Sequence, residues 1–289
     1  MDRGFLSNVE LRTPSGRIYY IIAISVLLLV ALVTLFPFFF AFTSGLKDST
    51  EIFQGGLNLL PDNARWENYQ QAWDWFEMPR LFGNSFIIAG VGVLLRLTVS
   101  SAAAFSLSKL KPIGAKFITL GFMLTLMIPS MAYFVPLYTT IARLPIINVS
   151  LLNSYWGLWL PYCVDAFSIF VLKTFFDRIP ADLIDSARVD GANALQMLVH
   201  IIVPLSRSIF VVLFVLAFVG LWKDFLLPYL VLTDPYTQPI TVRLFYIADD
   251  YSINLQMAAS FMALLPPLLI AIILQRYMKI GLTLGGVKG

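Results

Sequence analysis

Six long apolar stretches constrain the fold of this 289-residue chain more than any other feature. A helix needs about 20 predominantly apolar residues to cross the hydrocarbon core of a bilayer. The candidate spans are 19–44, 81–107, 117–142, 151–175, 205–232 and 254–277. Only 13% of the residues are charged and 58% are hydrophobic, whereas about a quarter are charged in a typical soluble domain. The sequence therefore predicts an all-α integral membrane protein with six transmembrane helices.

The basic residues predict which segments face the cytoplasm, because cytoplasmic loops carry an excess of Lys and Arg. With the N-terminus inside, the inner segments hold Arg3, Arg12, Arg17, Lys109, Lys111, Lys116, Lys173, Arg178, Arg188, Arg207, Arg276, Lys279 and Lys288. The outer segments hold only Lys47, Arg65, Arg80, Arg143 and Arg243. We therefore expect a cytoplasmic N-terminal segment (1–18), a membrane domain (19–280) and a cytoplasmic tail (281–289). This asymmetry explains the net charge of +3, and no nucleic-acid partner is expected.

A polar, charged segment between the fourth and fifth spans, 175–204, interrupts the apolar pattern. Leu183, Ile184 and Ala187 form a narrow apolar stripe on one short helix. Gly191 is free to take the left-handed conformation that ends such a helix. A second helical phase is marked by Leu195, Leu198, Val199 and Ile202. Two short helices joined at a glycine can present an apolar knob to a groove on a soluble partner.

This segment resembles the cytoplasmic loop of binding-protein-dependent ABC transporter permeases. The family pattern reads Glu-Ala-Ala, three residues, Gly, then Ile and Leu-Pro further on. Here the triplet is Asp185–Ala187, the glycine is Gly191, and Val203-Pro204 stands for Leu-Pro. The flanking residues 175–180 and 190–192 are similar to the carbohydrate-uptake branch, and the end of the chain, described below, resembles the second membrane subunit of maltose-type importers. Asp185 is one methylene shorter than the family's Glu, which alters any salt bridge that it forms with a partner.

The resemblance implies a type I importer permease with a two-part coupling helix in its cytoplasmic loop, 177–204. Such a permease moves a sugar or oligosaccharide across the cytoplasmic (inner) membrane of a prokaryote. The implied partners are a second, homologous permease subunit, two ATPase subunits that bind ATP and Mg²⁺, and an extracytoplasmic solute-binding protein. The chain itself would hold no cofactor, no metal and no catalytic residue. The implied ATPase-docking residues are Leu183, Ile184, Asp185, Ser186, Ala187, Arg188, Asp190 and Gly191.

The glycine-rich end of the chain, 281–289, resembles the tail that reaches between the two ATPase subunits in maltose-type importers. The residues implied to contact the ATPases are Gly285, Gly286, Val287 and Lys288. This run is not a phosphate-binding loop, because GxxxxGK[ST] requires a strand before it and a helix after it.

A mixed aromatic and polar motif, 220–228, lies in the fifth span and resembles the family's Trp-Asn-Asp/Glu-Phe-x-x-Pro. Lys223 replaces the Asn. Neighbouring residues of a helix point about 100° apart, so Lys223 and Asp224 are not a ready ion pair. Aromatic and polar groups together suit a sugar, and a cation at this place favours an acidic sugar. The candidate path and substrate residues are Gly220, Trp222, Lys223, Asp224 and Phe225.

Other polar and proline residues inside the spans are given structural roles. A charge at the bilayer centre costs about 2.5–3.5 kcal/mol, so Arg96 and Asp165 are expected to lie near the ends of spans and to be structural. Pro129 and Pro136 interrupt the third span, either as kinks around a pathway or as a packing irregularity. In the outer loop, 47–78, we expect a short helix near Asn68–Trp75 that serves as an interfacial belt or receives the solute-binding protein.

Two other classes of protein are weighed against the importer. A secondary transporter driven by an ion gradient predicts an internal repeat and paired intramembrane carboxylates, and the sequence shows no convincing example of either. A membrane enzyme needs a catalytic set. The single histidine, His200, is expected to pack beside an apolar row, and Cys163 is the one cysteine.

Overall fold

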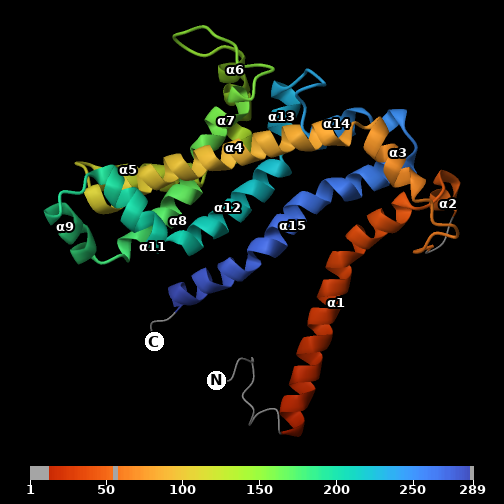
Figure 1. Cartoon of the computed structure of the whole chain (residues 1–289), viewed down its shortest axis with the longest axis horizontal. Helices are drawn as coiled ribbons and strands as arrows, with labels where there is room; N and C mark the ends of the chain where they lie inside the picture. The colour runs from red at the N-terminus through yellow and green to blue at the C-terminus, as the bar shows by residue number, and fades with distance from the viewer. Residues whose placement is uncertain (1–12, 55–57, 287–289) are drawn as a thin grey trace. The chain divides into compact units, whose positions relative to one another are not determined.

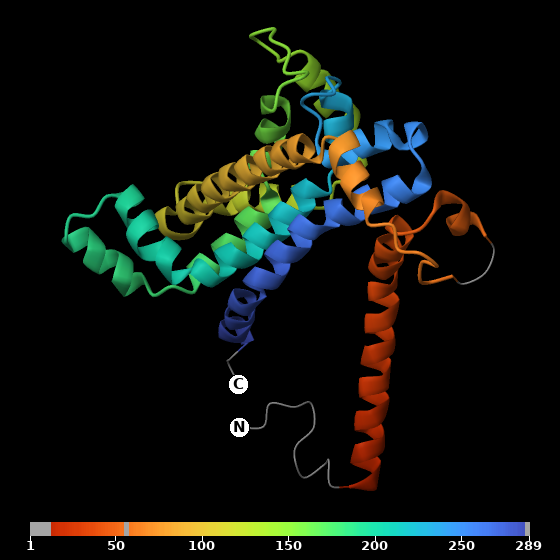
Figure 2. The ribbon, with the colours of Figure 1, turned by 45° about the vertical axis from the view of Figure 1, so that its right-hand side comes forward.

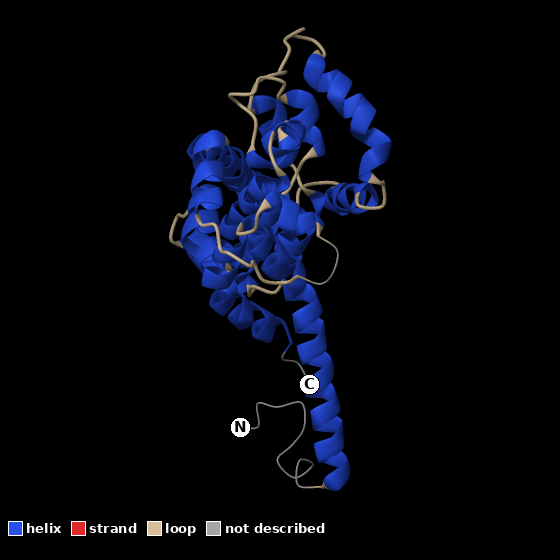
Figure 3. Cartoon of the chain, turned by 90° about the vertical axis from the view of Figure 1, so that its right-hand side faces the viewer, coloured by secondary structure: helices blue, strands red, loops and turns tan. Residues whose placement is uncertain are grey.

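The computed structural model describes residues 13–54 and 58–286, with side chains as far as Tyr277. Every regular element in these ranges is a helix (Figure 3), which confirms the predicted all-α class. The helices group into two compact units. The first comprises the described residues up to Asp74 together with Asp250–Met262; the second comprises Trp75–Asp249 and the residues from Ala263 onward. The predicted boundaries at 18 and 280 stay predictions.

The helices follow one another with few long connections. The first unit holds α1 (Pro14–Gly45), α2 (Ser49–Phe53), α3 (Glu67–Trp75) and the beginning of α15 (Ile253–Gly286). The second unit holds α4 (Met78–Phe105), α5 (Ala115–Thr125), α6 (Phe134–Ala142), α7 (Trp156–Cys163), α8 (Ala166–Asp177), α9 (Ala181–Val189), α10 (Ala194–Met197), α11 (Val203–Leu205), α12 (Arg207–Trp222), α13 (Leu226–Val231), α14 (Ile240–Tyr246) and the rest of α15. Short π-helical turns at Ser106–Leu110 and Leu198–Ile202 continue α4 and α10.

The number of membrane-spanning helices agrees with the prediction when two bent pairs are included. Four helical stretches are long and apolar enough to cross a bilayer, namely Pro14–Gly45, Met78–Leu110, Trp156–Asp177 and Ile253–Tyr277. Ala115–Thr125 with Ser130–Ala142 is bent by 98°, and Ala194–Leu205 with Arg207–Trp222 by 84°. Counting each bent pair as one span gives six.

Two helices extend beyond the spans predicted for them. Helix α1 begins at Pro14 rather than Tyr19, because Thr13 caps it and proline fits the first turn of a helix. At the other end of the chain, α15 continues to Gly286, while its candidate membrane span, Ile253–Tyr277, agrees with the predicted 254–277. The predicted break of the third span is confirmed at Pro129, where the missing N–H removes a helical hydrogen bond.

The helix is broken within both the fourth and the fifth predicted spans. Helix α7 ends at Cys163, and Asp165 caps α8 by accepting hydrogen bonds from the backbone N–H and hydroxyl of Ser168 at 2.8 and 2.5 Å. Helix α12 ends at Trp222, and a three-residue link, 223–225, precedes α13. Asp165 therefore begins a helix, which agrees with its expected structural role.

Hydrogen bonds inside the first unit hold the segment between α1 and α3. The predicted short helix is confirmed as α3. Asn68 Nδ2 donates to the carbonyl oxygens of Gly45 and Lys47, each at 2.9 Å, and Tyr69 Oη donates to that of Phe42 at 2.9 Å. A Cβ at Gly45 would approach Tyr69 Oη to 2.9 Å, so only glycine allows this contact. The ammonium of Lys47 is buried and donates to the carbonyl of Asn58.

Helix α4 is the centre of the second unit and packs along α7, α8 and α12 (Figure 1). At its beginning, Asn84 Nδ2 donates to the carbonyl oxygens of Tyr236 and Gln238 at 2.8 and 2.9 Å. At its other end, Ser108 Oγ donates to Asp177 at 2.6 Å. The chain therefore brings the turn after α4 and the segment after α8 to one end of this unit.

Six basic residues of the second unit gather at that same end. Two adjoining pockets there are lined by Lys109, Lys111, Lys116, Lys173, Arg178 and Arg188. All of these belong to the segments predicted to be inside. The clustering supports the positive-inside topology for this unit, and the assignment of its sides stays a prediction.

Candidate functional site

The segment Ala181–Ile202, called the hinged segment below, forms two short helices joined at a glycine, as predicted. Helix α9 ends at Val189, and Gly191 follows with φ of 83°, in the left-handed region that favours glycine. A capping box then starts α10: Asn193 Oδ1 accepts from the N–H of Gln196 at 2.9 Å, and Gln196 Oε1 accepts from the N–H of Asn193 at 2.8 Å. Local sequence thus determines both helices and the turn.

The underside of the hinged segment is buried against the membrane helices. Ile184 is 3% exposed and Ile202 is fully buried. They pack in one apolar cluster with Ala104, Phe105, Leu172, Phe176, Ile179, Ala187, Met197, Leu198 and Leu213. Burying one large aliphatic side chain contributes about 1.5–3 kcal/mol. The cluster therefore ties the hinged segment to α4, α8 and α12, and Figure 2 shows the segment beyond the ends of α8 and α12.

Polar bonds fix the beginning of the hinged segment to the turn after α4. Lys109 Nζ donates to the carbonyl oxygen of Ile179 at 2.7 Å. Asp177 accepts from Ser108 Oγ at 2.6 Å and pairs with Lys173 Nζ at 2.8 Å. Hydrogen bonds with one charged partner are roughly twice as strong as neutral ones. Apolar and polar contacts together make the segment a fixed extension of the membrane helices.

The outer face of the hinged segment is exposed. Leu183 is 45% exposed and Val189 88%. Asp185 and Arg188 form a surface ion pair at 3.1 Å, which contributes at most about 1 kcal/mol. Six of the eight predicted docking residues are exposed, namely Leu183, Asp185, Ser186, Arg188, Asp190 and Gly191.

Two details of the predicted segment are corrected by packing. Ile184 and Ala187 face inward and are buried, so Leu183 does not share their side of α9. His200, expected to pack, is exposed, and its Nδ1 lies 3.2 Å from the carbonyl oxygen of Gln196. The 3.6-residue period explains both results, because neighbouring residues of a helix point in different directions.

A second polar feature lies within the membrane-spanning part of the second unit. Arg96 Nε donates to the carbonyl oxygen of Tyr162 at 2.9 Å, and Tyr162 Oη donates to Asp224 Oδ2 at 2.5 Å. Thr241 Oγ1 donates to the carbonyl oxygen of Asp224 at 3.0 Å. These four residues are called the polar chain below. It joins α4, the end of α7, the link after α12 and α14.

The polar chain lies where two broken spans meet. Tyr162 is in the last turn of α7, so its carbonyl oxygen has no partner within the helix, and Arg96 supplies one. Asp224 lies in the link between α12 and α13. Irregular backbone at membrane depth is tolerated only where protein groups or a water-filled cavity satisfy it. Arg96 thus has the structural role expected for it, although it lies well inside α4 rather than near an end.

The predicted path residues differ in accessibility. Trp222 is 4% exposed, its Nε1 donates to the carbonyl oxygen of Ala263 at 3.1 Å, and its ring lies 4.9 Å from Phe86. Lys223 is exposed and follows the last turn of α12. Within the described residues, Lys223 forms no ion pair with Asp224, as predicted. In this conformation Lys223 is open to a ligand, whereas Trp222 is covered.

Sequence analysis missed Tyr162 and Thr241 as partners of Asp224. Tyr162 lies in an aromatic run, 155–162, that gives no polar signal. The one sequence feature near it is Asp165, which marks the break after α7.

The structure describes two of the four residues predicted to form the tail contacts. Gly285 and Gly286 lie in α15, and Val287 and Lys288 lie outside the described residues.

Removal of the Tyr162 hydroxyl tests the polar chain. Tyr162→Phe is expected to lower the free energy of unfolding of the purified chain by about 1.5–3 kcal/mol, because the half-buried carboxylate of Asp224 loses a charge-assisted hydrogen bond from a buried hydroxyl. Unfolding in detergent followed by tryptophan fluorescence measures this loss. Tyr155→Phe is the control, since Tyr155 Oη donates at 3.0 Å to the neutral side chain of Asn84. An equal loss in both variants would contradict a special role for the polar chain.

A comparison with protein families decides the identity of the chain. The model of the family described as "Binding-protein-dependent transport system inner membrane component" matches residues 96–280. The match includes the hinged segment and all four residues of the polar chain. The chain belongs to this family. It is a transport permease rather than a member of a catalytic family, as the resemblance of the hinged segment predicted.

Individual relatives of this permease cover almost its whole length. It is 30% identical over 267 residues to the sn-glycerol-3-phosphate transport system permease protein UgpE of Yersinia enterocolitica, which covers 89% of this chain and 93% of the relative. It is also 30% identical over 286 residues to UgpE of Brucella suis, covering 95% and 98%. Neither relative supports an ion-gradient-driven transporter.

A crystal structure has the same fold as this permease. A chain in the crystal structure of a bacterial ABC transporter involved in the import of the acidic polysaccharide alginate aligns with a TM-score of 0.80 and 21% identity. The alignment covers 92% of this chain and 98% of that one. The predicted importer permease fold is therefore confirmed.

Proposed function

We propose that this permease is the membrane-spanning subunit of an ATP-driven importer for a sugar or oligosaccharide. It lies in the cytoplasmic membrane of a bacterium, with both termini and the hinged segment in the cytoplasm. It works beside a second, homologous permease subunit and receives its cargo from an extracytoplasmic solute-binding protein. Two ATPase subunits hydrolyse ATP with Mg²⁺, and this chain contributes no catalytic group.

The observation that carries this proposal is the two-sided hinged segment. Its underside is buried among α4, α8 and α12, and its outer face exposes Leu183 and Val189. Exposed apolar residues on a short helix suit a groove on a soluble partner. A movement of the partner is then transmitted to three membrane helices at once. The partner can shift the permease only if its contacts with this face differ between its nucleotide states.

The docking residues divide into two groups on this view. Leu183, Asp185, Ser186, Arg188, Asp190 and Gly191 form the face that contacts the ATPase. Ile184 and Ala187 transmit its movement, because they are buried within the permease. The end of the chain, 285–288, makes a second contact between the ATPase subunits.

The cargo is proposed to be hydroxylated and acidic. The relatives are named for sn-glycerol 3-phosphate, and the similar crystal structure is of an importer of an acidic polysaccharide. Lys223 is exposed at the broken fifth span, next to the polar chain. Its ammonium offers an anionic sugar a charged partner, and the neighbouring Gly220, Trp222, Asp224 and Phe225 complete the candidate path.

Transport by the reconstituted importer tests this function. The permease is produced with the subunits encoded beside it and placed in vesicles that contain ATP and Mg²⁺. We expect uptake of an acidic oligosaccharide from its binding protein, and roughly tenfold slower uptake for Lys223→Gln if one charge contact of about 1.4 kcal/mol is lost. Arg243→Gln, a cation in α14, is the matched control. Uptake driven by an ion gradient without ATP would contradict the proposal.

A further inference from the structure

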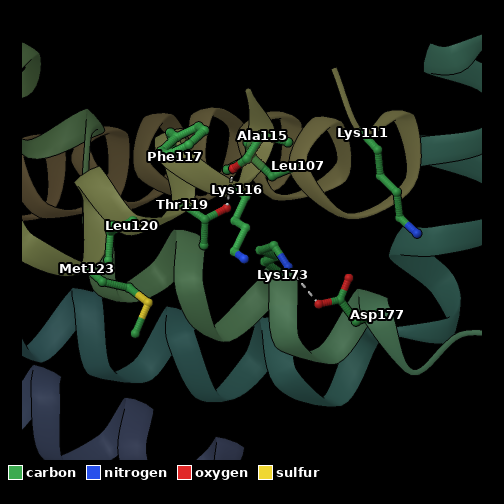
Figure 4. Close-up of a pocket in the computed structure, with 10 residues that line it drawn as sticks. All are labelled: Leu107, Lys111, Ala115, Lys116, Phe117, Thr119, Leu120, Met123, Lys173 and Asp177. Carbon is green, nitrogen blue, oxygen red and sulfur yellow. Dashed lines mark hydrogen bonds and ion pairs between the residues drawn. The ribbon is translucent and has the colours of Figure 1, made fainter. Parts of the chain in front are cut away.

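A pocket of about 510 Å³ lies between α5 and α8 and has no part in the proposed transport function. Figure 4 shows the residues that line it: Leu107, Lys111, Ala115, Lys116, Phe117, Thr119, Leu120, Met123, Lys173 and Asp177. It belongs to the second unit alone. Its lining combines a long apolar wall with several ammonium groups, which is an unusual mixture for a surface in contact with hydrocarbon.

The apolar wall follows one face of α5. Phe117, Leu120 and Met123 are spaced three residues apart and are 78%, 51% and 42% exposed. Residues three apart lie on the same side of a helix. Leu107, which also lines the pocket, is buried. The wall therefore offers a strip of about two helical turns on which a hydrocarbon chain can lie.

The charged part of the pocket is strongly positive. Lys111, Lys116 and Lys173 line it together with one carboxylate, Asp177, which Lys173 already neutralises at 2.8 Å. In the part of the chain that the structure describes, no hydrogen bond or ion pair joins the ammonium groups of Lys111 and Lys116 to another residue. Figure 4 shows Lys116 and Lys173 directed into the same space. The pocket thus has two cations available for an anion.

The position of these lysines matches a membrane boundary. Lys111 directly follows the span Met78–Leu110, Lys116 is in the first turn of α5, and Lys173 is in the last turns of α8. Apolar residues continue from there into the spans. A phosphate at the lysines would therefore lie at headgroup level, with its acyl chains beside α5. Basic pockets between transmembrane helices bind anionic lipid headgroups in this way.

We propose that this pocket binds an anionic phospholipid. Lys116 binds its phosphate, Lys111 adds positive charge on the other side of the Lys173–Asp177 pair (Figure 4), and Phe117, Leu120 and Met123 contact an acyl chain. The apolar wall favours a lipid over a free anion, because a free anion would leave the wall uncovered. The positive charge favours an anionic lipid over a zwitterionic one, because the ammonium of a zwitterionic headgroup would be repelled by three lysines. The site does not depend on the identity of the transported cargo.

Native mass spectrometry of the full-length permease, alone and with its copurifying partners, tests the site. The detergent-solubilised protein is offered phosphatidylglycerol or phosphatidylcholine with matched acyl chains, and inorganic phosphate in a separate arm. We expect retention of phosphatidylglycerol over phosphatidylcholine. Lys111→Gln with Lys116→Gln should reduce this preference roughly 30-fold, since one lysine near a charged membrane surface contributes about 1 kcal/mol, or fivefold.

Two further double variants make the result specific. Arg143→Gln with Arg243→Gln also removes two positive charges, but from α14 and the end of α6, and should keep the preference. Lys111→Arg with Lys116→Arg keeps the charge and should bind phosphatidylglycerol as well as the native chain. Four results would each overturn the proposal. The first two are equal retention of both lipids and an unchanged preference in the glutamine variant. The other two are displacement of the lipid by phosphate alone and loss of the lipid when the partners bind.

Discussion

Replacement of Gly191 by valine is expected to reduce uptake by the assembled importer at least tenfold while ATP hydrolysis continues. Gly191 has φ of 83°, and a residue with a Cβ in this region costs roughly 1–2 kcal/mol, with β-branched residues the least tolerated. A Cβ at this position would meet no atom within 4 Å, so a clash contributes nothing. The backbone instead relaxes, which changes the angle between α9 and α10 and thus the face that is offered to the ATPase.

Uptake and ATP hydrolysis by reconstituted vesicles measure this uncoupling, and immunoblotting confirms that the variant reaches the membrane. Gly191→Asn is the matched control, because asparagine adopts the left-handed conformation more readily than other residues with side chains. It should retain most of the uptake. Native transport by the valine variant would refute the hinge mechanism.

The second large effect is expected from a charge placed under the hinged segment. Ile184→Asp introduces a carboxylate at a position that is 3% exposed. The variant loses about 1.5–3 kcal/mol of apolar burial and must also hydrate or neutralise the new charge. We expect the hinged segment to detach from its cluster, so that limited proteolysis cuts between α9 and α10 and uptake is lost even when the ATPase is present.

Leu183→Asp is the neighbouring control, and it should act differently. Leu183 is 45% exposed, so the purified permease should keep its resistance to proteolysis and its unfolding free energy. Copurification of the ATPase subunits should fall, because the exposed face loses an apolar contact. If the two variants lost stability equally, or if Leu183→Asp still bound the ATPase as the native chain does, the division between buried and docking residues would be wrong.

The hinged segment shows how much local sequence can predict. Gly191 and the following helix were predicted because left-handed backbone and capping depend on residues next to one another. The sequence did not predict which of Leu183 and Ile184 is buried and which is exposed, because both belong to the apolar stripe. Packing against Phe176 and Leu213 selects Ile184. Leu213 lies in α12, well beyond α9 in the sequence, so no pattern within α9 contains this contact.

The broken spans show what local sequence left open. Residues 151–175 and 205–232 have the composition of continuous membrane helices. The chain breaks both at acidic residues, and the break is tolerated because Arg96 and Tyr162 satisfy groups that no longer belong to a helix. These partners are separated by more than 60 residues, so no local pattern contains them.

The sequence by itself determined that this protein crosses a membrane with six apolar stretches, bears its positive charge on alternate loops and carries a glycine-joined pair of short helices. Hydrophobicity, charge and backbone preference act over a few residues and can be read in order along the chain. Only the tertiary structure decided which side of the hinged segment is free, which polar groups meet inside the membrane domain and where the lysines border an apolar pocket. Each of these depends on atoms of distant residues coming within a few ångströms of one another.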